Sequence, residues 1–152
     1  VIDLPPGTGD IQLTLAQKIP VAGAIIVTTP QDIALLDARR AVHMFRKVNV
    51  PVLGVVENMS THICTACGHE EAIFGHGGGE QMAADFDIPL LGQLPLTMEI
   101  RSSLDAGTPT MMQNQDSPIA KSYRKLALRA AGVLSVMPRS MTLQMPEIVV
   151  QS

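Results

Sequence analysis

The sequence predicts an α/β protein with a parallel sheet and helices on both faces, of the P-loop NTPase type. Apolar, β-branched runs of strand length recur at residues 22–29, 51–57 and 89–95. Each run is nearly continuous, which is typical of a strand covered on both faces. Segments with helical periodicity separate the runs. Such alternation predicts parallel strands joined by right-handed helical crossovers.

The first part of the chain predicts a strand end and a short helix. Val1–Leu4 is apolar and is expected to end a buried strand, because a Pro-Pro-Gly turn comes directly after it at residues 5–7. Residues 11–18 have a helical pattern, and Asp10 is a candidate N-cap for that helix.

Four further helices are expected, over residues 32–48, 79–87 and 98–106 and from Ser117 onward. Gly107 would end the third, and Pro118 fits the first turn of the fourth. The helix over residues 32–48 is expected to bury one side. The residues expected on that side are Ile33, Leu36, Ala41, Met44, Phe45 and Val48. The last helix has an expected apolar face of Ile119, Tyr123, Leu126, Ala127, Ala130 and Leu134.

Composition and charge narrow the function classes. The chain has 152 residues, 46% of them hydrophobic and 16% charged, which is typical of one globular domain or a piece of one. Its net charge of −3 and scarce aromatic residues give no reason to expect nucleic acid. No run reaches the ~18 apolar residues of a membrane span. The chain opens without Met, inside an expected strand, and is interpreted as the later part of a longer protein.

Two loops at expected carboxyl ends of strands are candidate nucleotide contacts, since ligands of parallel sheets bind there. Asp3 is placed where nucleotide hydrolases hold the water shell of Mg²⁺, and Gly7, Thr8 and Gly9 come after it. Asn58 could read the edge of a base. From residue types alone, an Asp that caps a tight turn explains Asp3 equally well, and a simple turn residue is the favoured explanation of Asn58. The phosphate-binding pattern G-x-x-x-x-G-K-[ST] does not occur in the sequence.

The stretch STHICTACGHEEAIFGHGGGE, residues 60–80, contains both cysteines and three of the four histidines. Cys64 and Cys67 could form part of a zinc site, a redox dithiol, or half of a four-thiolate site completed by a second copy, or could have no role. A Cys₂His₂ site with His62 and His69 would be strained, because each histidine is two residues from a cysteine. The spacing favours a metal shared by two chains in a reducing compartment, expected to be the cytoplasm.

Four segments in this order resemble the Mrp/ApbC family of P-loop ATPases. They are VIDLPPGTGD, the stretch from VTTPQDIALL to VVENMS, CTACGHEEAIFGHGGGE, and LGQLPLTMEIRSSLDAGTP. Members of this family have a deviant Walker A motif, carry iron–sulfur clusters and are related to the MinD and ParA ATPases. The resemblance covers residues 1–136 and leaves 137–152 as an expected extended tail. The metal-binding insertion is expected at about residues 59–78.

The resemblance implies a role for each candidate. Asp3 matches the Walker B acid, residues 5–10 (with Gly7, Thr8 and Gly9) the switch loop, and Asn58 and Pro95 the adenine pocket. Cys64 and Cys67 match the pair that holds a [4Fe–4S] cluster between two protomers. ATP and Mg²⁺ would be cofactors of the full-length protein.

The sequence departs from the family pattern in having no deviant Walker A loop. The full-length protein is therefore expected to be an ATPase, and this chain alone is not. The expected partners are a second copy and the proteins that donate and accept clusters, without nucleic acid or membrane. A sheet lacking its first strand is also expected to expose an edge that invites pairing or swapping. The alternatives are a zinc-stapled structural dimer and a MinD-like positioning ATPase.

Overall fold

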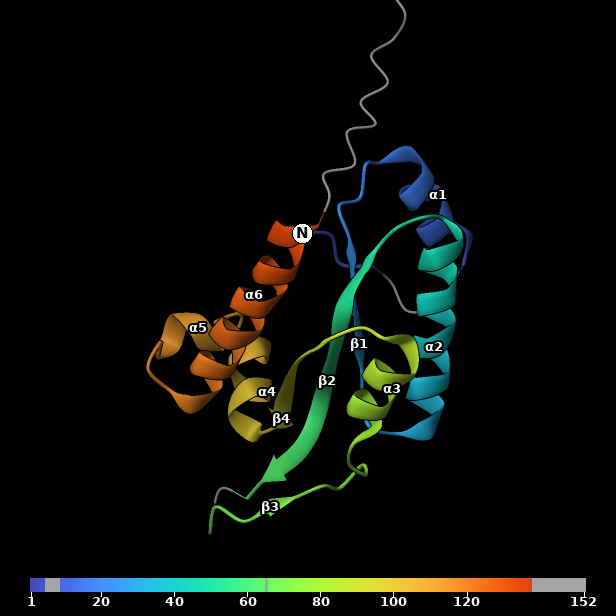
Figure 1. The fold of residues 1–152 in the computed structure, drawn as a ribbon. Coiled ribbons are helices and arrows are strands. Elements are labelled where there is room, and N and C mark those ends of the chain that lie inside the picture. Colours follow the sequence, from blue (N-terminus) through green and yellow to red (C-terminus); the bar gives the residue numbers. More distant parts are fainter. Residues whose placement is uncertain (5–8, 65, 138–152) are drawn as a thin grey trace, which may run out of the picture.

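The parallel sheet predicted from the sequence is present. The computed structural model describes residues 1–4, 9–64 and 66–137, and its central strand is β2 (Figure 1). Strands β1 and β4 run parallel to β2, and the short β3 pairs antiparallel with the far end of β2. The strands are β1 (Ala24–Thr28), β2 (Val52–Ile63), β3 (Glu70–Glu71) and β4 (Leu90–Leu96). The sheet is therefore mixed, with a parallel centre.

Helices cover both faces of this sheet, as predicted. Helices α2 and α3 lie on one side and α6 on the other (Figure 1). The larger core lies under α2, where Val42, Val55 and Met82 are fully buried. A smaller core lies between β4 and α6. The helices are α1 (Asp10–Lys18), α2 (Asp32–Lys47), α3 (Gly78–Phe86), α4 (Met98–Asp105), α5 (Thr110–Gln113) and α6 (Pro118–Val136).

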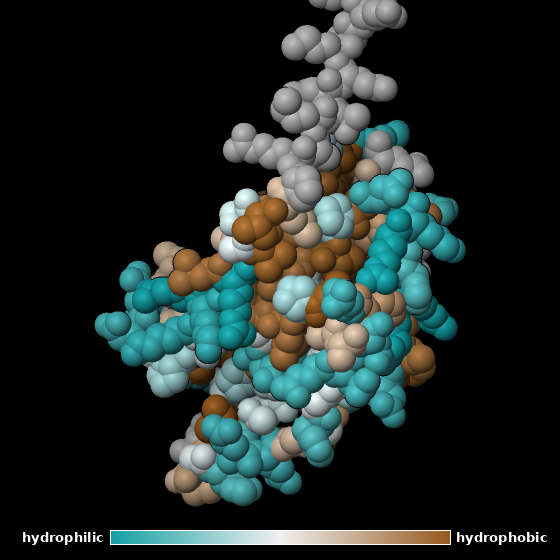
Figure 2. All heavy atoms as spheres, viewed as in Figure 1, coloured by the Kyte–Doolittle hydropathy of each residue, from teal (hydrophilic) through white to brown (hydrophobic). Residues whose placement is uncertain are grey.

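The prediction that β1 is covered on both faces is wrong. Its residues alternate between buried and exposed, and Ile25 and Val27 are 40% and 62% exposed. The physical reason is that α6 packs against β4 and β2, so it leaves the same face of β1 bare. Hydrophobic surface accordingly shows between the area of α6 and that of α2 and α3 (Figure 2).

The expectations for the first residues also need correction. Val1–Leu4 forms no strand, and Val1, Ile2 and Asp3 are exposed. A strand depends on the hydrogen-bonded ladder of a neighbour, and β1 pairs with β2 alone among the described strands. Helix α1 is present, but Gly9 is its N-cap and Asp10 is its first residue.

Helix α2 has the predicted bounds within one residue, and its expected buried side is confirmed in part: Met44 and Phe45 are buried, and Ala41 and Val48 pack against the core. Ile33 and Leu36 were expected in the core and are 74% and 55% exposed. Instead Ala38 and Val42 join Met44 and Phe45 in it. Helix α2 is amphipathic as predicted, but the position of the sheet decides which residues of the helix are buried.

The caps of the later helices agree with the sequence. The Ser117 hydroxyl accepts a hydrogen bond from the Ala120 N–H at 3.1 Å, and Pro118 is the first residue of α6. Of the expected apolar face of α6, Tyr123, Leu126 and Ala130 pack on the small core, whereas Ala127 and Leu134 are exposed. Of the expected tail at 137–152, residues 138–152 lie outside the described residues. Among the helices described, none is long and apolar enough to cross a membrane.

Candidate functional site

Strand β2 extends beyond the predicted end at residue 57 and carries the chain to the cysteines. It continues to Ile63, so Asn58 lies inside the strand and the insertion expected at residues 59–78 begins as β-structure. The pairing with β4 is irregular between Asn58 and His62, and Met59 has a positive φ of 56°. This is a bulge, which bends a strand and re-aims the residues beyond it. Strand β2 is longer than predicted, and Asn58 lies within it, for one reason. Pairing with β4 and β3 stabilises a polar segment whose composition does not indicate a strand.

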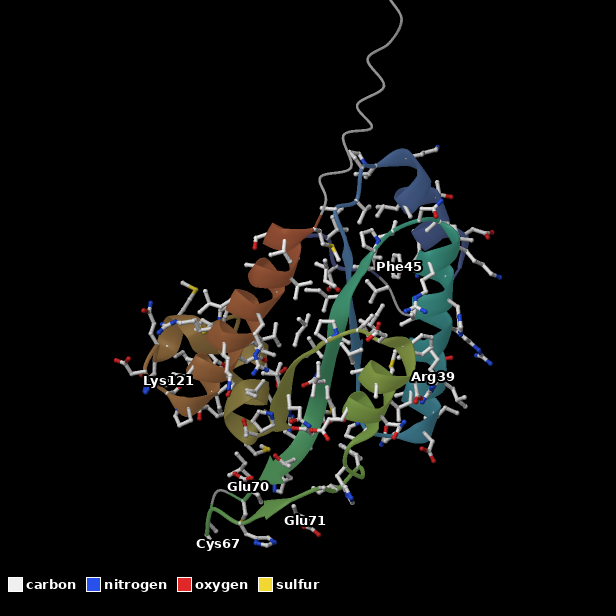
Figure 3. The ribbon with its side chains drawn as sticks, in the orientation of Figure 1. Arg39, Phe45, Cys67, Glu70, Glu71 and Lys121 are labelled. Carbon is white, nitrogen blue, oxygen red and sulfur yellow. The ribbon has the colours of Figure 1, made fainter. Side chains whose placement is uncertain are left out.

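Cys64 and Cys67 lie in a tight turn at the tip of the β2–β3 hairpin. His62 and Ile63 pair with Glu71 and Glu70, and the Cys64 N–H donates to the His69 carbonyl at 2.9 Å. The Gly68 N–H donates to the Cys64 carbonyl at 2.8 Å. Gly68 has a φ of 72°, a left-handed conformation that favours glycine. The turn projects from the carboxyl end of β2, away from the body of the fold (Figure 3).

The turn also sets the chemistry of the Cys64 sulfur. The backbone N–H of Ala66, the N–H of Cys67 and the Cys67 thiol donate hydrogen bonds that lower the pKa of Cys64 below its ordinary value. Thiolate is the form that binds metals and acts as a nucleophile. Both cysteines are free; Cys64 is partly exposed and Cys67 is exposed. The pair therefore offers two adjacent sulfurs to an incoming ion, cluster or protein.

One chain does not assemble a complete metal site in the part that the structure describes. No group of three or more His, Cys, Asp or Glu side chains there could jointly hold a metal ion. The Nδ1 atom of His62 lies 3.2 Å from the Leu96 carbonyl oxygen on β4, so this nitrogen is already in contact with the sheet. The described residues of one chain therefore do not form a Cys₂His₂ site.

Asn58 and Pro95 come from neighbouring strands. Asn58 on β2 is in register with Leu94 on β4, and Pro95 is the next residue. The Asn58 Oδ1 atom accepts the Met59 N–H at 3.0 Å, and the Ser60 hydroxyl donates to the Leu94 carbonyl at 3.2 Å. The structure thus places the two expected base-pocket residues side by side, and it also gives Asn58 a local role in the bulge.

The remaining expected nucleotide contacts are not gathered with them. Asp3 is exposed in the segment 1–4, and the N-terminus lies at the end of the fold opposite the cysteine turn (Figure 1). Gly9 is the N-cap of α1. Gly7 and Thr8 lie outside the described residues.

Glu57 is a buried carboxylate that the sequence analysis did not single out. It is 1% exposed. Its Oε2 atom accepts the Gly79 N–H at 2.6 Å, and its Oε1 atom accepts the Gln93 side chain at 3.0 Å. Helix α3 has no side-chain cap of its own, so Glu57 satisfies one of its free N–H groups, where the helix dipole favours an anion. The signal was an acidic residue ending an apolar run, with a Gly-Gly-Gly helix entry later in the chain.

We expect Glu57→Ala to lower the free energy of unfolding by about 2–3 kcal/mol, because it leaves buried donors unpaired. Glu57→Gln keeps an acceptor for the Gly79 N–H but loses the charge, so a loss of about 1 kcal/mol is expected. Urea denaturation of both variants at neutral pH measures the difference. Equal stability of the Ala variant and the unmodified chain would show that the Glu57 bonds contribute nothing.

Comparison with known proteins agrees with this architecture. The family described as ParA, NUBPL iron-transfer P-loop NTPase, matches residues 1–131. A nucleotide-binding protein of Archaeoglobus fulgidus, solved in complex with ADP, superposes with a TM-score of 0.62 at 37% identity, covering 70% of this chain and 44% of that one. The cell division ATPase MinD of Pyrococcus furiosus shares the fold, with a TM-score of 0.58 at 24% identity over 74% of this chain and 43% of that one.

A sequence relative agrees too. The iron-sulfur cluster carrier protein of Pseudomonas fragi is 65% identical over 128 residues, which are 84% of this chain and 45% of the relative. Because the family match covers residues 1–131, the chain belongs to that family, which is described as ParA, NUBPL iron-transfer P-loop NTPase. It spans less than half the length of this relative and of the two solved structures.

Proposed function

We propose that this chain is part of an iron–sulfur cluster carrier and that Cys64 and Cys67 provide half of the binding site for a [4Fe–4S] cluster. The observation that carries the proposal is the exposed cysteine turn. It presents two sulfurs together, and no third ligand accompanies them in the described chain. A cluster of this type takes four cysteine thiolates.

The other two thiolates come from a second copy. A two-fold axis presents the same patch twice, so two cysteine turns meeting at their tips supply four sulfurs. The position of the turn at the end of a projecting hairpin supports this, because the body of the fold does not obstruct the approach (Figure 3). Exposure also suits transfer, since an acceptor apoprotein can approach Cys67 with its own thiolates. A donor protein loads the cluster by the reverse exchange.

Nucleotide binding belongs to the full-length carrier, in the cytoplasm, where ATP hydrolysis would change the dimer and so the grip on the cluster. The residues present fit the base side of such a site, since Asn58 and Pro95 lie side by side. The resemblance assigns Mg²⁺ and the phosphates to Asp3, Gly7, Thr8 and Gly9. Asp3 does not lie with Asn58 and Pro95 in this structure, so the proposal for this chain covers the base side alone. Backbone N–H groups and a lysine provide most triphosphate binding, and the sequence has no such loop. This chain alone is therefore expected to lack ATPase activity.

Anaerobic reconstitution with iron and sulfide tests the proposal. We expect about four irons and four sulfides per two chains, held in a dimer whose mass is measured by native mass spectrometry. A cluster on a monomer would contradict the shared site. Firmly bound zinc that iron does not displace would instead favour the zinc-stapled dimer, because four cysteines also suit tetrahedral zinc.

A further inference from the structure

Helix α6 carries a cluster of cations on its outer side. These cations belong neither to the cysteine turn nor to the expected nucleotide side. This basic stripe surrounds a shallow hollow of about 380 Å³. Leu128 lies in the hollow and is 67% exposed. Lys121 projects from α6 on the side away from the sheet (Figure 3). The stripe consists of Lys121, Arg124, Lys125 and Arg129, all exposed.

The chain does not neutralise the basic stripe within its described part. Residues 118–136 contain no Asp or Glu. The ion pairs formed by the described residues involve Arg39, Arg40 and Arg101 and none of the four cations of the stripe. Arg129 donates to the Leu91 carbonyl at 3.3 Å, a contact that leaves its charge in place.

Helix stability does not explain the placement of these charges. A helix dipole favours anions at the N-terminal end and cations at the C-terminal end. Helix α6 has the opposite arrangement: Lys121 lies just after its first turn, and its last turn has no basic residue. Charges placed against the helix dipole, with no gain in stability, are expected where a surface serves a function.

We propose that the basic stripe docks an acidic segment of a partner protein, with an apolar side chain of that segment against Leu128. Arginine forks pair with carboxylates through two hydrogen bonds, and the lysines add point charges. The stripe is a confined positive area: the net charge is −3, so the rest of the chain carries −7 once its four cations are set aside. A compact acidic segment fits such an area.

Extended polyanions fit it less well, because the acidic remainder of the chain would repel them. No aromatic residue lines the stripe to stack on bases. Membrane insertion needs an apolar helix face, and that of α6 is packed on the small core through Tyr123, Leu126 and Ala130.

The test is binding of a fluorescein-labelled peptide of repeated Glu-Glu-Leu units to the full chain, measured by fluorescence anisotropy. We expect Lys121→Glu with Lys125→Glu to weaken binding about tenfold or more, a loss of about 1.4 kcal/mol. The control, Lys18→Glu with Lys47→Glu, makes the same change in net charge on exposed residues outside α6 and should leave binding within about twofold of the unmodified chain. Thermal unfolding should show the α6 variant at least as stable as the unmodified chain, because its new acids complement the dipole.

Three results would overturn the proposal. Equal weakening by both double variants would mean that only net charge matters. No weakening by the α6 variant would place the peptide elsewhere. Tighter binding to phosphatidylserine vesicles than to the peptide, lost in the α6 variant alone, would identify a membrane surface as the occupant.

Discussion

Replacing either Cys64 or Cys67 by serine is expected to abolish cluster binding, because two copies would then present only two thiolates. Cluster content after anaerobic reconstitution, measured as iron and sulfide per chain and by visible absorbance, should fall to the background of the unreconstituted protein. The fold should survive, since Cys67 is exposed and Cys64 partly so. Substitutions at such positions change stability by up to about 0.5 kcal/mol, or about 2 °C in Tm for a domain of this size.

The matched control is His69→Gln. His69 is an exposed metal-ligand type in the same turn, and its backbone carbonyl, which accepts the Cys64 N–H, is unchanged by the substitution. This variant should retain a full cluster. If it loses the cluster as completely as the serine variants do, the ligand set is not four cysteines. If the serine variants keep iron and sulfide at the level of the unmodified chain, the cysteine turn is not the binding site.

Gly54→Ala is expected to have the largest effect on stability, about 3 kcal/mol or more. Gly54 lies in β2 with a φ of 151°, and an added Cβ would be 2.4 Å from the Pro89 carbonyl oxygen and 2.7 Å from Leu91 Cγ. The nearest atom is a backbone atom of Pro89, so the segment that leads into β4 must move. That movement would weaken the hydrogen bond of 2.9 Å that the Val55 N–H donates to the same Pro89 carbonyl. Backbone strain and overpacking each cost about 1–3 kcal/mol.

Gly132→Ala is the control for this prediction. Gly132 lies in α6, and an added Cβ there would meet nothing within 4 Å. Alanine should therefore stabilise the chain by about 0.5–1 kcal/mol through its higher helix propensity. Urea denaturation of both variants should give changes of opposite sign. A Gly54→Ala variant within about 1 kcal/mol of the unmodified chain would show that β2 and β4 can separate at little cost.

The two parts of the candidate site are linked through one strand. Asn58, on the expected nucleotide side, is separated from Cys64 by the bulge in β2. Glu57, the residue before Asn58, holds the first turn of α3, which begins where the stretch with the cysteines ends. Both ends of the proposed metal-binding segment are therefore anchored beside the expected nucleotide side of the sheet. A displacement of β2 at this point would move the cysteine turn and its return to α3 together.

Elements whose signals are local were predictable from the sequence. The hydroxyl of Ser117 and the ring of Pro118 determine where α6 begins, and Gly107 comes two residues after the end of α4. The periodicity of residues 32–48 predicts α2, and the apolar runs predict β1, the first half of β2, and β4. Each of these signals acts through neighbours along the chain, so it survives without knowledge of the fold.

That Cys64 and Cys67 lie close together was also evident from the sequence alone, because only two residues separate them along the chain. The tertiary structure decided what surrounds them. It extended β2 through a polar segment to Ile63, because β3 and β4 provide hydrogen-bond partners there. It buried Glu57 against α3 and left Ile25, Val27 and Ile33 exposed, because burial depends on which helix covers which part of the sheet. These outcomes depend on contacts between segments distant in the chain, which no local pattern encodes.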